Sequence, residues 1–266
     1  MSADATFADD FDGPGLDPDV WLPHYLPMWS SREATRASYR LEQSCLVLDI
    51  PRDHGLWLPE EHPSPLRLSG VQSGNRSGPV GSASGQQAVY DGQQVREEQP
   101  ELVGHLQDGG HLEIRCRMTI SARSMAAFWL CGFEDEPEHC GEICVTEVFG
   151  KDVVPGRSAE VGVGLKQIRD PHLAQDFAAP RLPIDVADFH TYAVDWDADE
   201  AVFTVDGEEV RRCAAPPTYP LQLMVAVFDF PEWSTGDDDQ LVPELWVDRI
   251  SGRAPRTGRS NLSVEG

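Results

Sequence analysis

The sequence predicts an all-β chain in which antiparallel sheets pack as a sandwich or jelly roll. Short alternating or apolar runs recur along the 266 residues, and Gly, Pro and Asp turn signals separate them. Apolar residues at the 3.6-residue spacing of an amphipathic helix are nearly absent. The length suits one large domain or two small ones. Because the runs read as one sheet system, we assign residues 1–253 to a single domain and expect residues 254–266 to be a disordered tail.

The clearest strands are in residues 192–210, YAVDWDADEAVFTVDGEEV. Two alternating runs are joined through Asp197 to Glu200, and the second run ends at Asp206-Gly207, a favoured hairpin turn. This pattern predicts three consecutive antiparallel strands. Other strands are expected, in chain order, at CLVLDI, HLEIRCRMTI, MAAFWLCGF, EICVTEVF, AEVGVGLKQI, LQLMVAVFDF and ELWVDRI.

Two irregular stretches connect these strands. Residues 69–100 are rich in Gly, Ser and Gln and poor in large apolar side chains, which is typical of either a flexible linker or a binding loop. Residues 166–189 connect strands in the same manner.

The charge balance limits the partners of the chain. Asp and Glu number 45 and Lys and Arg 21, a net charge of −24, so nucleic acid and anionic membranes would be repelled, whereas a neutral ligand is compatible. No run reaches the roughly 20 apolar residues that a membrane helix needs, and the first residues lack the pattern of a signal peptide. We therefore expect a monomer in the cytoplasm, or a secreted protein if a leader has been removed.

The six cysteines have neither a C-x-x-C pair nor the spacing of a zinc site, so most are expected to be buried thiols. Cys131 and Cys140 flank an acidic loop and would meet across a hairpin. A cytoplasmic setting argues against a stable disulfide, and the pairing of these two stays open.

The segment GEICVTEVFG, residues 141–150, places Glu142 and Glu147 five positions apart, with Cys144 between them. Strict alternation would send the two glutamates to opposite faces of a strand. A β-bulge at Val145 or Thr146 would return Glu147 to the face of Glu142. The pair is then either catalytic or two ordinary solvated carboxylates.

Several segments together resemble family 16 of the glycoside hydrolases, the laminarinase and lichenase group. The resemblance extends over most of the chain and implies a concanavalin A-like β-jelly-roll sandwich of two antiparallel sheets. It is carried, in order, by FADDFDGPGLDPDVW, GGHLEIRCRMTI followed by AAFWL, FHTYAVDWDADEAVFTVDGEEV, YPLQLMVAVFDF and LWVDRI.

The family signature is Glu, aliphatic, Asp, aliphatic, an optional extra aliphatic residue, then Glu. The resemblance implies that Glu142 is the nucleophile and Glu147 the general acid and base, with Cys144 where the family has Asp. Thr146 is a lesser departure, and Lys166-Gln167 stands where a groove histidine is expected. A thiol is a weak donor and a poor acceptor, so this exchange predicts a slowed enzyme.

The expected activity is retaining, endo-acting hydrolysis of a β-linked glucan, with β-1,3 or mixed linkage favoured and a polysaccharide or oligosaccharide as partner. One alternative is a carbohydrate-binding protein on the same fold with weak or no catalysis. Another is a transglycosylase, in which a sugar instead of water resolves the covalent intermediate.

Sugar-binding residues are sought among aromatic and polar side chains in irregular stretches. Tyr25, Trp29 and Trp233 are candidate platforms for a pyranose ring, the alternative being rim residues that cover the sandwich edge. Asn75 and Arg76 are candidate donors to sugar hydroxyls, or solvated loop residues.

Three further tryptophans, Trp129, Trp196 and Trp246, lie within alternating strands and are expected in the core. Catalysis requires no cofactor. The resemblance implies that Asp248 supplies one carboxylate to a structural calcium, which needs six to eight oxygen ligands.

Overall fold

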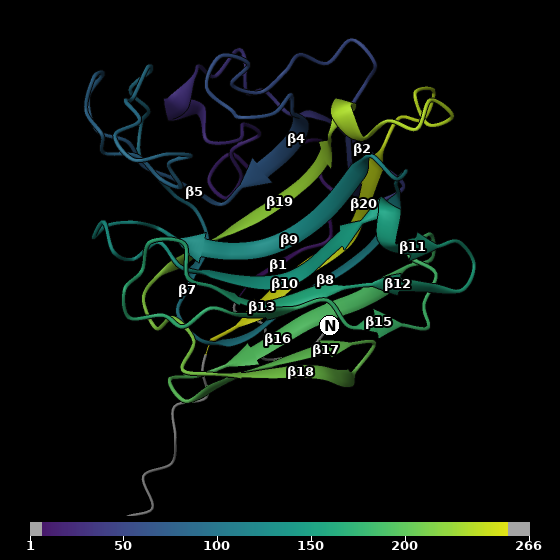
Figure 1. Ribbon diagram of the computed structural model, residues 1–266. Helices are drawn as coiled ribbons and strands as arrows, with labels where there is room; N and C mark the ends of the chain where they lie inside the picture. Colours follow the sequence, from purple (N-terminus) through teal and green to yellow (C-terminus); the bar gives the residue numbers. More distant parts are fainter. Residues whose placement is uncertain (1–6, 255–266) are drawn as a thin grey trace, which may run out of the picture.

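A computed structural model describes residues 7–254 of the chain. Two large antiparallel sheets lie face to face, and irregular segments cover the second face of one of them (Figure 1). The predicted all-β sandwich is confirmed. The predicted tail, residues 254–266, falls outside the described residues except for Ala254.

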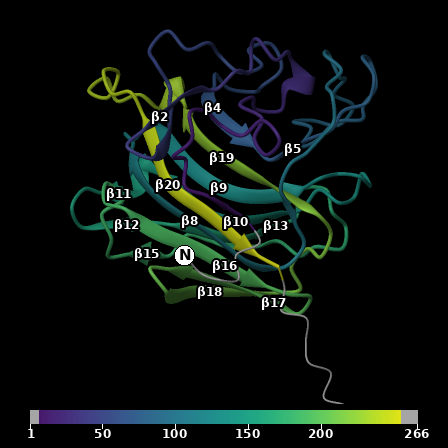
Figure 2. The ribbon, with the colours of Figure 1, turned by 180° about the vertical axis from the view of Figure 1, so that it is seen from behind.

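The outer sheet has eight strands in the order β18-β17-β16-β8-β20-β3-β2, with β1 paired to β20. Figure 2 shows this sheet, with β20 crossing beside β8. Its strands are β1 (Phe7–Asp9), β2 (Ser38–Glu42), β3 (Cys45–Asp49), β8 (Gly110–Thr119), β16 (His190–Trp196), β17 (Glu200–Val205), β18 (Glu208–Ala214) and β20 (Glu244–Arg253).

The second sheet, here called the groove sheet, has seven strands in the order β14-β13-β10-β9-β19-β4, with β7 paired to β19. Its central strands curve beneath the purple and blue loops in Figure 1. The strands are β4 (Arg67–Gln72), β7 (Leu106–Gln107), β9 (Ser124–Gly132), β10 (Glu142–Phe149), β13 (Gly162–Lys166), β14 (Asp176–Ala178) and β19 (Leu221–Asp229).

Small elements complete the fold. The strands β11 (Val153–Val154), β12 (Ser158–Glu160) and β15 (Arg181–Leu182) form one minor sheet, and β5 (Gly74–Asn75) and β6 (Leu102–Val103) form another. Three 3₁₀ turns are η1 (Pro27–Trp29), η2 (Gly150–Asp152) and η3 (Pro231–Trp233). The run expected as one strand at residues 159–168 is thus divided between β12 and β13.

The main core lies between the two large sheets and is built from alternate residues of their strands. Leu112 and Ile114 of β8 meet Phe128 of β9 and Ile143 of β10 in this layer. A second apolar layer lies on the other face of the groove sheet, between its strands and residues of the segments 26–29, 57–68 and 95. Every residue of β9 and β19 is therefore buried, because both faces of these strands are covered.

The three consecutive strands predicted in residues 192–210 are confirmed as β16, β17 and β18, each paired antiparallel to the next. The turn between β17 and β18 has φ of 50° at Asp206 and 83° at Gly207. Positive φ at both positions is what a two-residue hairpin turn requires, and Asp-Gly adopts it with little strain.

The segment 69–100 is attached to the sandwich along its length. Its first residues belong to β4, and the Gln86 amide donates to Phe133 O at 2.9 Å and to Gln222 Oε1 at 3.1 Å. These contacts to the groove sheet favour the binding-loop interpretation over the linker. All six cysteines are free and buried, so Cys131 and Cys140 are separate thiols.

Candidate active site

A β-bulge in β10 brings the two glutamates to one face. Against β9, Cys144 pairs with Trp129 and Thr146 with Phe128, so Val145 is the extra residue. Val145 and Val148 point into the main core, while Glu142, Cys144 and Glu147 line one cavity on the groove face. The bulge that would return Glu147 to the face of Glu142 is thus present, at Val145.

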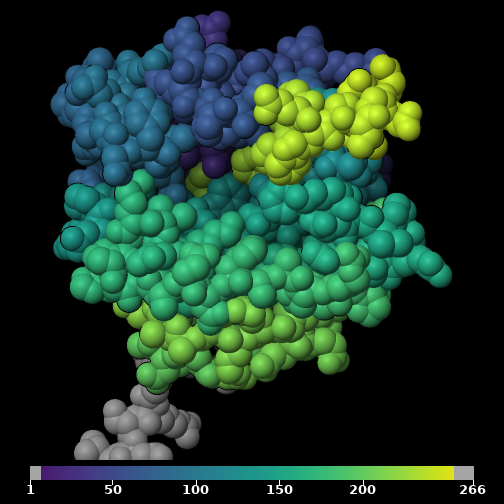
Figure 3. All heavy atoms as spheres, viewed as in Figure 1, coloured from purple at the N-terminus to yellow at the C-terminus, as the bar shows by residue number. Residues whose placement is uncertain are grey.

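This cavity, here called the catalytic cavity after the role proposed below for its two glutamates, has a volume of about 170 Å³ and lies between the covering loops and the groove sheet. Figure 3 shows this face of the molecule hollowed where the blue loops meet the teal strands. The cavity is lined by Tyr25, Met125, Ala127, Trp129, Glu142, Cys144, Glu147, Lys166 and Phe228.

Aromatic rings form one wall of the catalytic cavity. The Tyr25 ring lies 6.3 Å from Trp129 and 6.0 Å from Phe228, and the latter two rings are 6.1 Å apart. Their carbon faces beside two carboxyl groups suit a pyranose, which offers C–H groups on its faces and hydroxyls at its edge. The structure therefore brings Tyr25 to the glutamates, as its candidate role requires.

Burial raises the pKa of Glu142 to about 7. The ammonium of Lys166 opposes this shift, whereas the negative charges of Glu147 and Glu134 add to it. Glu142 therefore keeps its proton across the weakly acidic range, in which an ordinary glutamate is ionised.

Glu147 is in an ion pair with Lys166, whose Nζ donates to Glu147 Oε2 at 2.7 Å. The same ammonium lies 4.7 Å from the centre of the Phe177 ring. A Cβ on Gly162, the cross-strand partner of Glu147, would come within 2.6 Å of this ring. The glycine thus leaves room for Phe177 beside the ion pair.

Cys144 is a buried thiol whose Sγ lies 3.7 Å from Gly162 O. Burial raises its pKa well above the usual value, and Glu147 and Glu142 add to the rise while Lys166 opposes it. The largest cause is burial. The sulfur is a neutral thiol and not a nucleophile.

Two predicted sugar ligands are not accessible, and these predictions are corrected. Trp29 is fully buried in the second apolar layer, where its Nε1 donates to Gln86 O at 2.8 Å. Asn75 is fully buried and its amide donates to Pro100 O at 3.0 Å. The groove sheet needs a cover for its second face, and these segments supply it, so neither side chain presents a surface to a sugar.

Trp233 is 41% exposed and stacks on Phe230 with 4.2 Å between ring centres. The Phe149 ring lies 6.0 Å from Trp233, and the Lys151 ammonium is 4.9 Å from the Trp233 ring centre. This aromatic stack lies where β10 and β19 end, outside the catalytic cavity. A platform role for Trp233 stays a prediction.

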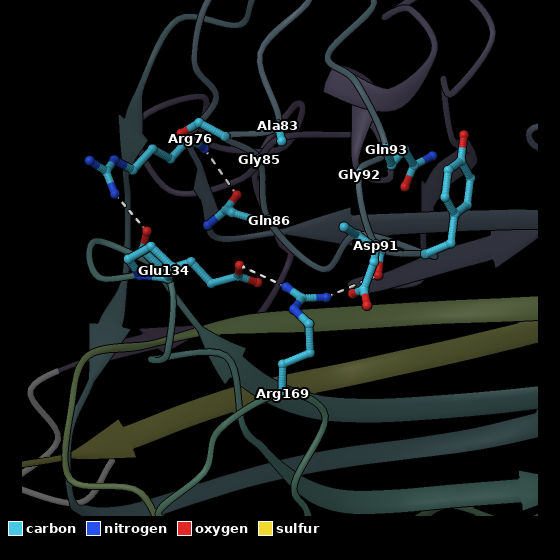
Figure 4. Close-up of a pocket in the computed structure, with 13 residues that line it drawn as sticks. Arg76, Ala83, Gly85, Gln86, Asp91, Gly92, Gln93, Glu134 and Arg169 are labelled. Carbon is cyan, nitrogen blue, oxygen red and sulfur yellow. Dashed lines mark hydrogen bonds and ion pairs between the residues drawn. The ribbon is translucent and has the colours of Figure 1, made fainter.

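Arg76 lies in a different cavity, of about 380 Å³, together with Glu134 and Arg169 (Figure 4). Its guanidinium donates to the backbone oxygen of Glu134 at 2.6 Å. The residue is thus a partly buried member of a polar network, not a freely solvated loop arginine.

Asp248 is paired with an arginine. Its carboxylate accepts from Arg115 Nη1 at 2.7 Å, and it lies at the irregularity where β20 shifts register against β8. Among residues 7–254 no group of three or more His, Cys, Asp or Glu side chains is placed to hold a metal ion. Calcium also accepts backbone carbonyl oxygens, and the role of Asp248 as one of its ligands stays a prediction.

Sequence reasoning missed Trp129, Phe228 and Lys166 as cavity residues. Trp129 was expected in the core, and of the three strand tryptophans only Trp196 lies in the main core. Trp246 packs on the outer face of the outer sheet with Cys45 and Val47. The sequence showed Lys166-Gln167 at the place where the family has a groove histidine. That Lys166 pairs with Glu147 depends on the register of β10 against β13.

A two-sheet jelly roll with paired glutamates in a groove defines a class of glycan-hydrolysing proteins. The model of the family described as glycosyl hydrolases family 16 matches residues 108–242, just over half of the chain. The chain therefore belongs to this family. No curated protein matches it.

Solved structures agree in fold. The chain is similar to a GlcNAcα1-4Gal releasing endo-β-galactosidase from Clostridium perfringens, with a TM-score of 0.79 and 23% identity, covering 97% of this chain and 64% of that one. It thus spans less than two thirds of that protein's length. It is also similar to the catalytic domain of an endo-1,3-β-glucanase (laminarinase) from Thermotoga petrophila RKU-1 and to a laminarinase catalytic domain from Thermotoga maritima MSB8. The Thermotoga petrophila structure has a TM-score of 0.65 and 18% identity, and the match covers 93% of this chain and 96% of that one. The Thermotoga maritima structure has a TM-score of 0.65 and 17% identity, and the match covers 95% of this chain and 98% of that one.

None of the helices in residues 7–254 is both long and apolar enough to cross a membrane.

Proposed function

We propose that the chain is an endo-acting glycoside hydrolase that cleaves a β-linked glucan or galactan with retention of configuration. The observation that carries this proposal is the bulge in β10, which places Glu142 and Glu147 on one face in one cavity with an aromatic wall. Family membership and the laminarinase and endo-β-galactosidase folds support it.

In the proposed reaction the Glu142 carboxylate attacks the anomeric carbon, and Glu147 gives a proton to the departing glycosidic oxygen. Glu147 then takes a proton from the water that hydrolyses the glycosyl ester on Glu142. The wall of Tyr25, Trp129 and Phe228 holds the apolar face of the sugar during both steps.

The resting protonation of Glu142 opposes its role. Burial raises the pKa of Glu142 to about 7, so below that pH the ionised carboxylate that attacks the sugar is the minor form in the free protein. Lys166 occupies Oε2 of Glu147, the proposed general acid, through an ion pair. Both features support the expectation of a slow enzyme.

The same ion pair favours a second candidate, a carbohydrate-binding protein on this fold. The Lys166 ammonium, bonded to the Glu147 carboxylate, would permit sugar binding against the aromatic wall while it blocks proton transfer from Glu147. The two candidates differ in whether bonds are cleaved.

A reducing-sugar screen separates them. It would cover β-1,3, β-1,4 and mixed-linkage glucans, galactans and xyloglucan, with Glu142→Gln and Glu147→Gln as controls and affinity electrophoresis on the same polymers. Hydrolysis predicts reducing ends from at least one polymer with the parent protein and from none with either variant. Retardation on a polymer with no release above the Glu142→Gln background would instead establish the binding protein.

A further inference from the structure

A second cavity lies at the edge of the groove sheet where β10 begins. Glu134, which follows the end of β9, and Arg169, which follows the end of β13, both line it (Figure 4). Glu142 is the first residue of β10. Glu142 is the cross-strand partner of Cys131, three residues before Glu134. The cavity therefore lies on the Glu142 side of the catalytic pair.

One wall of this cavity is made by residues 76–93, which lie outside the stretch matched by the family model. The wall is supported from behind, because a Cβ on Gly85 would come within 2.6 Å of the buried Trp29 ring. Trp29 thus supports a binding wall although it contacts no sugar. Residues of the covering loops therefore build this wall.

Buried polar groups order the cavity. The Glu134 side chain is only 6% exposed and accepts from the Gln87 backbone N–H at 2.6 Å and from Arg169 Nη2 at 3.2 Å. Arg169 also donates to Ala88 O at 3.1 Å, which joins the loop after β13 to the wall. Gln86 is 1% exposed and accepts from the Arg76 backbone N–H at 2.9 Å.

The lining chemistry selects the kind of ligand. The charged residues are two arginines, Arg76 and Arg169, and two acids, Asp91 and Glu134, so an anion would meet carboxyl groups as well as guanidinium groups. Tyr90 is the one aromatic residue among the lining residues, so an apolar ligand finds little surface. Alternating donors and acceptors in a cavity of about 380 Å³ suit a ligand with many hydroxyl groups.

We propose that this second cavity is a subsite for one neutral, hydroxyl-rich sugar unit of the glycan, on the Glu142 side of the catalytic pair. The inference rests on the proposed function and extends it: the chain recognises a sugar beyond the cleavage site by hydrogen bonds. It predicts that affinity rises when an oligosaccharide becomes long enough to reach the cavity.

The test measures binding without turnover. The Glu142→Gln protein is titrated calorimetrically with neutral β-1,3-gluco-oligosaccharides and β-1,4-galacto-oligosaccharides of two to six units. Ala83→Trp, added to this background, fills the cavity from an exposed wall position and so leaves the core unchanged. Val103→Trp is the matched control, because Val103 is an exposed residue that does not line the cavity.

The parent should bind longer oligosaccharides of one series more tightly than short ones. Ala83→Trp should weaken binding of the longer ones about tenfold, as expected for the loss of one or two net hydrogen bonds, and leave the shortest unchanged. Val103→Trp should match the parent. Arg76→Gln, which keeps polarity but removes the guanidinium, should weaken the longer ligands in the same length-dependent way.

Equal affinity of parent and Ala83→Trp at every length, or an equal loss at every length, would overturn the subsite. Tighter binding of oligogalacturonate than of both neutral series would overturn the neutral class of ligand. Length-dependent, Ala83→Trp-sensitive binding in a chain that releases no reducing ends would retain the subsite while the proposed hydrolysis fails. Release of reducing ends by a chain whose binding Ala83→Trp does not weaken would retain the proposed hydrolysis and overturn the subsite.

Discussion

The two ends of the groove sheet present opposite chemistry. Where β10 begins, Glu134, Arg169 and Gln86 line a polar cavity beside the loop of residues 76–93. Where β10 ends, Phe149 and Trp233 form an open aromatic surface. One end can hold a sugar by its hydroxyls and the other by its faces, so a glycan chain would lie across the sheet in a defined direction.

The two lysines of the chain lie in different parts of this groove. Lys151 lies over the aromatic surface, 5.4 Å from the Phe149 ring centre and 4.9 Å from that of Trp233. Lys166 lies at the catalytic pair, bonded to Glu147. Each ammonium is near an aromatic ring, but only Lys166 can change the protonation of a catalytic group.

The catalytic pair lies between the two ends, and its removal has the largest expected effect. Glu142→Gln should reduce turnover of every substrate by about a thousandfold or more, because no covalent intermediate forms. Glu147→Ala should still glycosylate on an aryl glycoside with a good leaving group, and added azide should rescue this variant alone. Proton NMR of early products should show the β-anomer.

Rescue of the Glu142 variant by azide, with an inverted glycosyl azide as product, would contradict the assignment at that residue. An α-anomer formed first would favour an inverting site and remove both assigned roles.

The aromatic end depends on one buried carboxylate. Asp229, at the end of β19, accepts from Arg123 Nε at 2.5 Å and pairs with Arg67 Nη2 at 2.5 Å. Asp229→Ala leaves two guanidinium groups without their buried partner and should lower the free energy of unfolding by roughly 3–5 kcal/mol. Chemical denaturation measures this.

Asp239→Ala is the matched control for the aromatic end. Asp239 pairs with the same Arg123, but its side chain is 52% exposed, so its loss should cost about 1 kcal/mol or less. Equal costs for the two variants would show that Asp229 does not anchor this end.

Cys144→Asp tests the centre of the groove. An Asp there can draw the Lys166 ammonium from Glu147 and share hydrogen bonds with the two glutamates. If one charge-assisted hydrogen bond of roughly 1.5–3 kcal/mol is restored, kcat/KM should rise about ten- to a hundredfold. Cys144→Ser should change it much less. A folded, sugar-binding Asp variant without released reducing ends would support the binding-protein alternative.

The pH dependence follows from Glu142. The nucleophile must be ionised, so kcat/KM should rise as pH increases through about 7, where Glu142 loses its proton. Lys166→Met removes a positive charge that lowers this pKa, so the rise should move to higher pH. Lys151→Met, the other lysine variant, should leave the profile in place. A rise near the ordinary glutamate value in the parent would contradict the raised pKa.

The sequence predicted the elements whose signal is local. The three consecutive strands β16 to β18 follow from alternation and turn chemistry. The shared face of the glutamates required a bulge at Val145 or Thr146, which strict alternation does not predict. Contacts set by register or by loop packing were not predictable. Lys166 is the cross-strand partner of Glu142 yet bonds Glu147, and this depends on the bulge and on Gly162 making room for Phe177.

The aromatic candidates for sugar binding also show that tertiary packing was not predictable from local sequence. Tyr25 and Trp29 lie four residues apart in one Pro-rich segment, and nothing local distinguishes them. Their places depend on which of them faces the groove sheet: Tyr25 lines the catalytic cavity, while Trp29 packs under Gly85. Only the tertiary fold of residues 69–100 decides this.

The smallest expected effect belongs to Trp233, at the open aromatic end. Its ring is partly exposed, so Trp233→Ala should cost little stability while removing a stacking surface. We expect oligosaccharides that extend beyond Glu147 to bind about three- to tenfold more weakly, or roughly 0.5–1.5 kcal/mol, with no change for shorter ones. Leu241→Ala, at an exposed apolar residue outside the stack, is the control. A lower melting temperature with unchanged affinity would assign Trp233 to covering the sandwich edge, and the groove would then bind its ligand from the polar end alone.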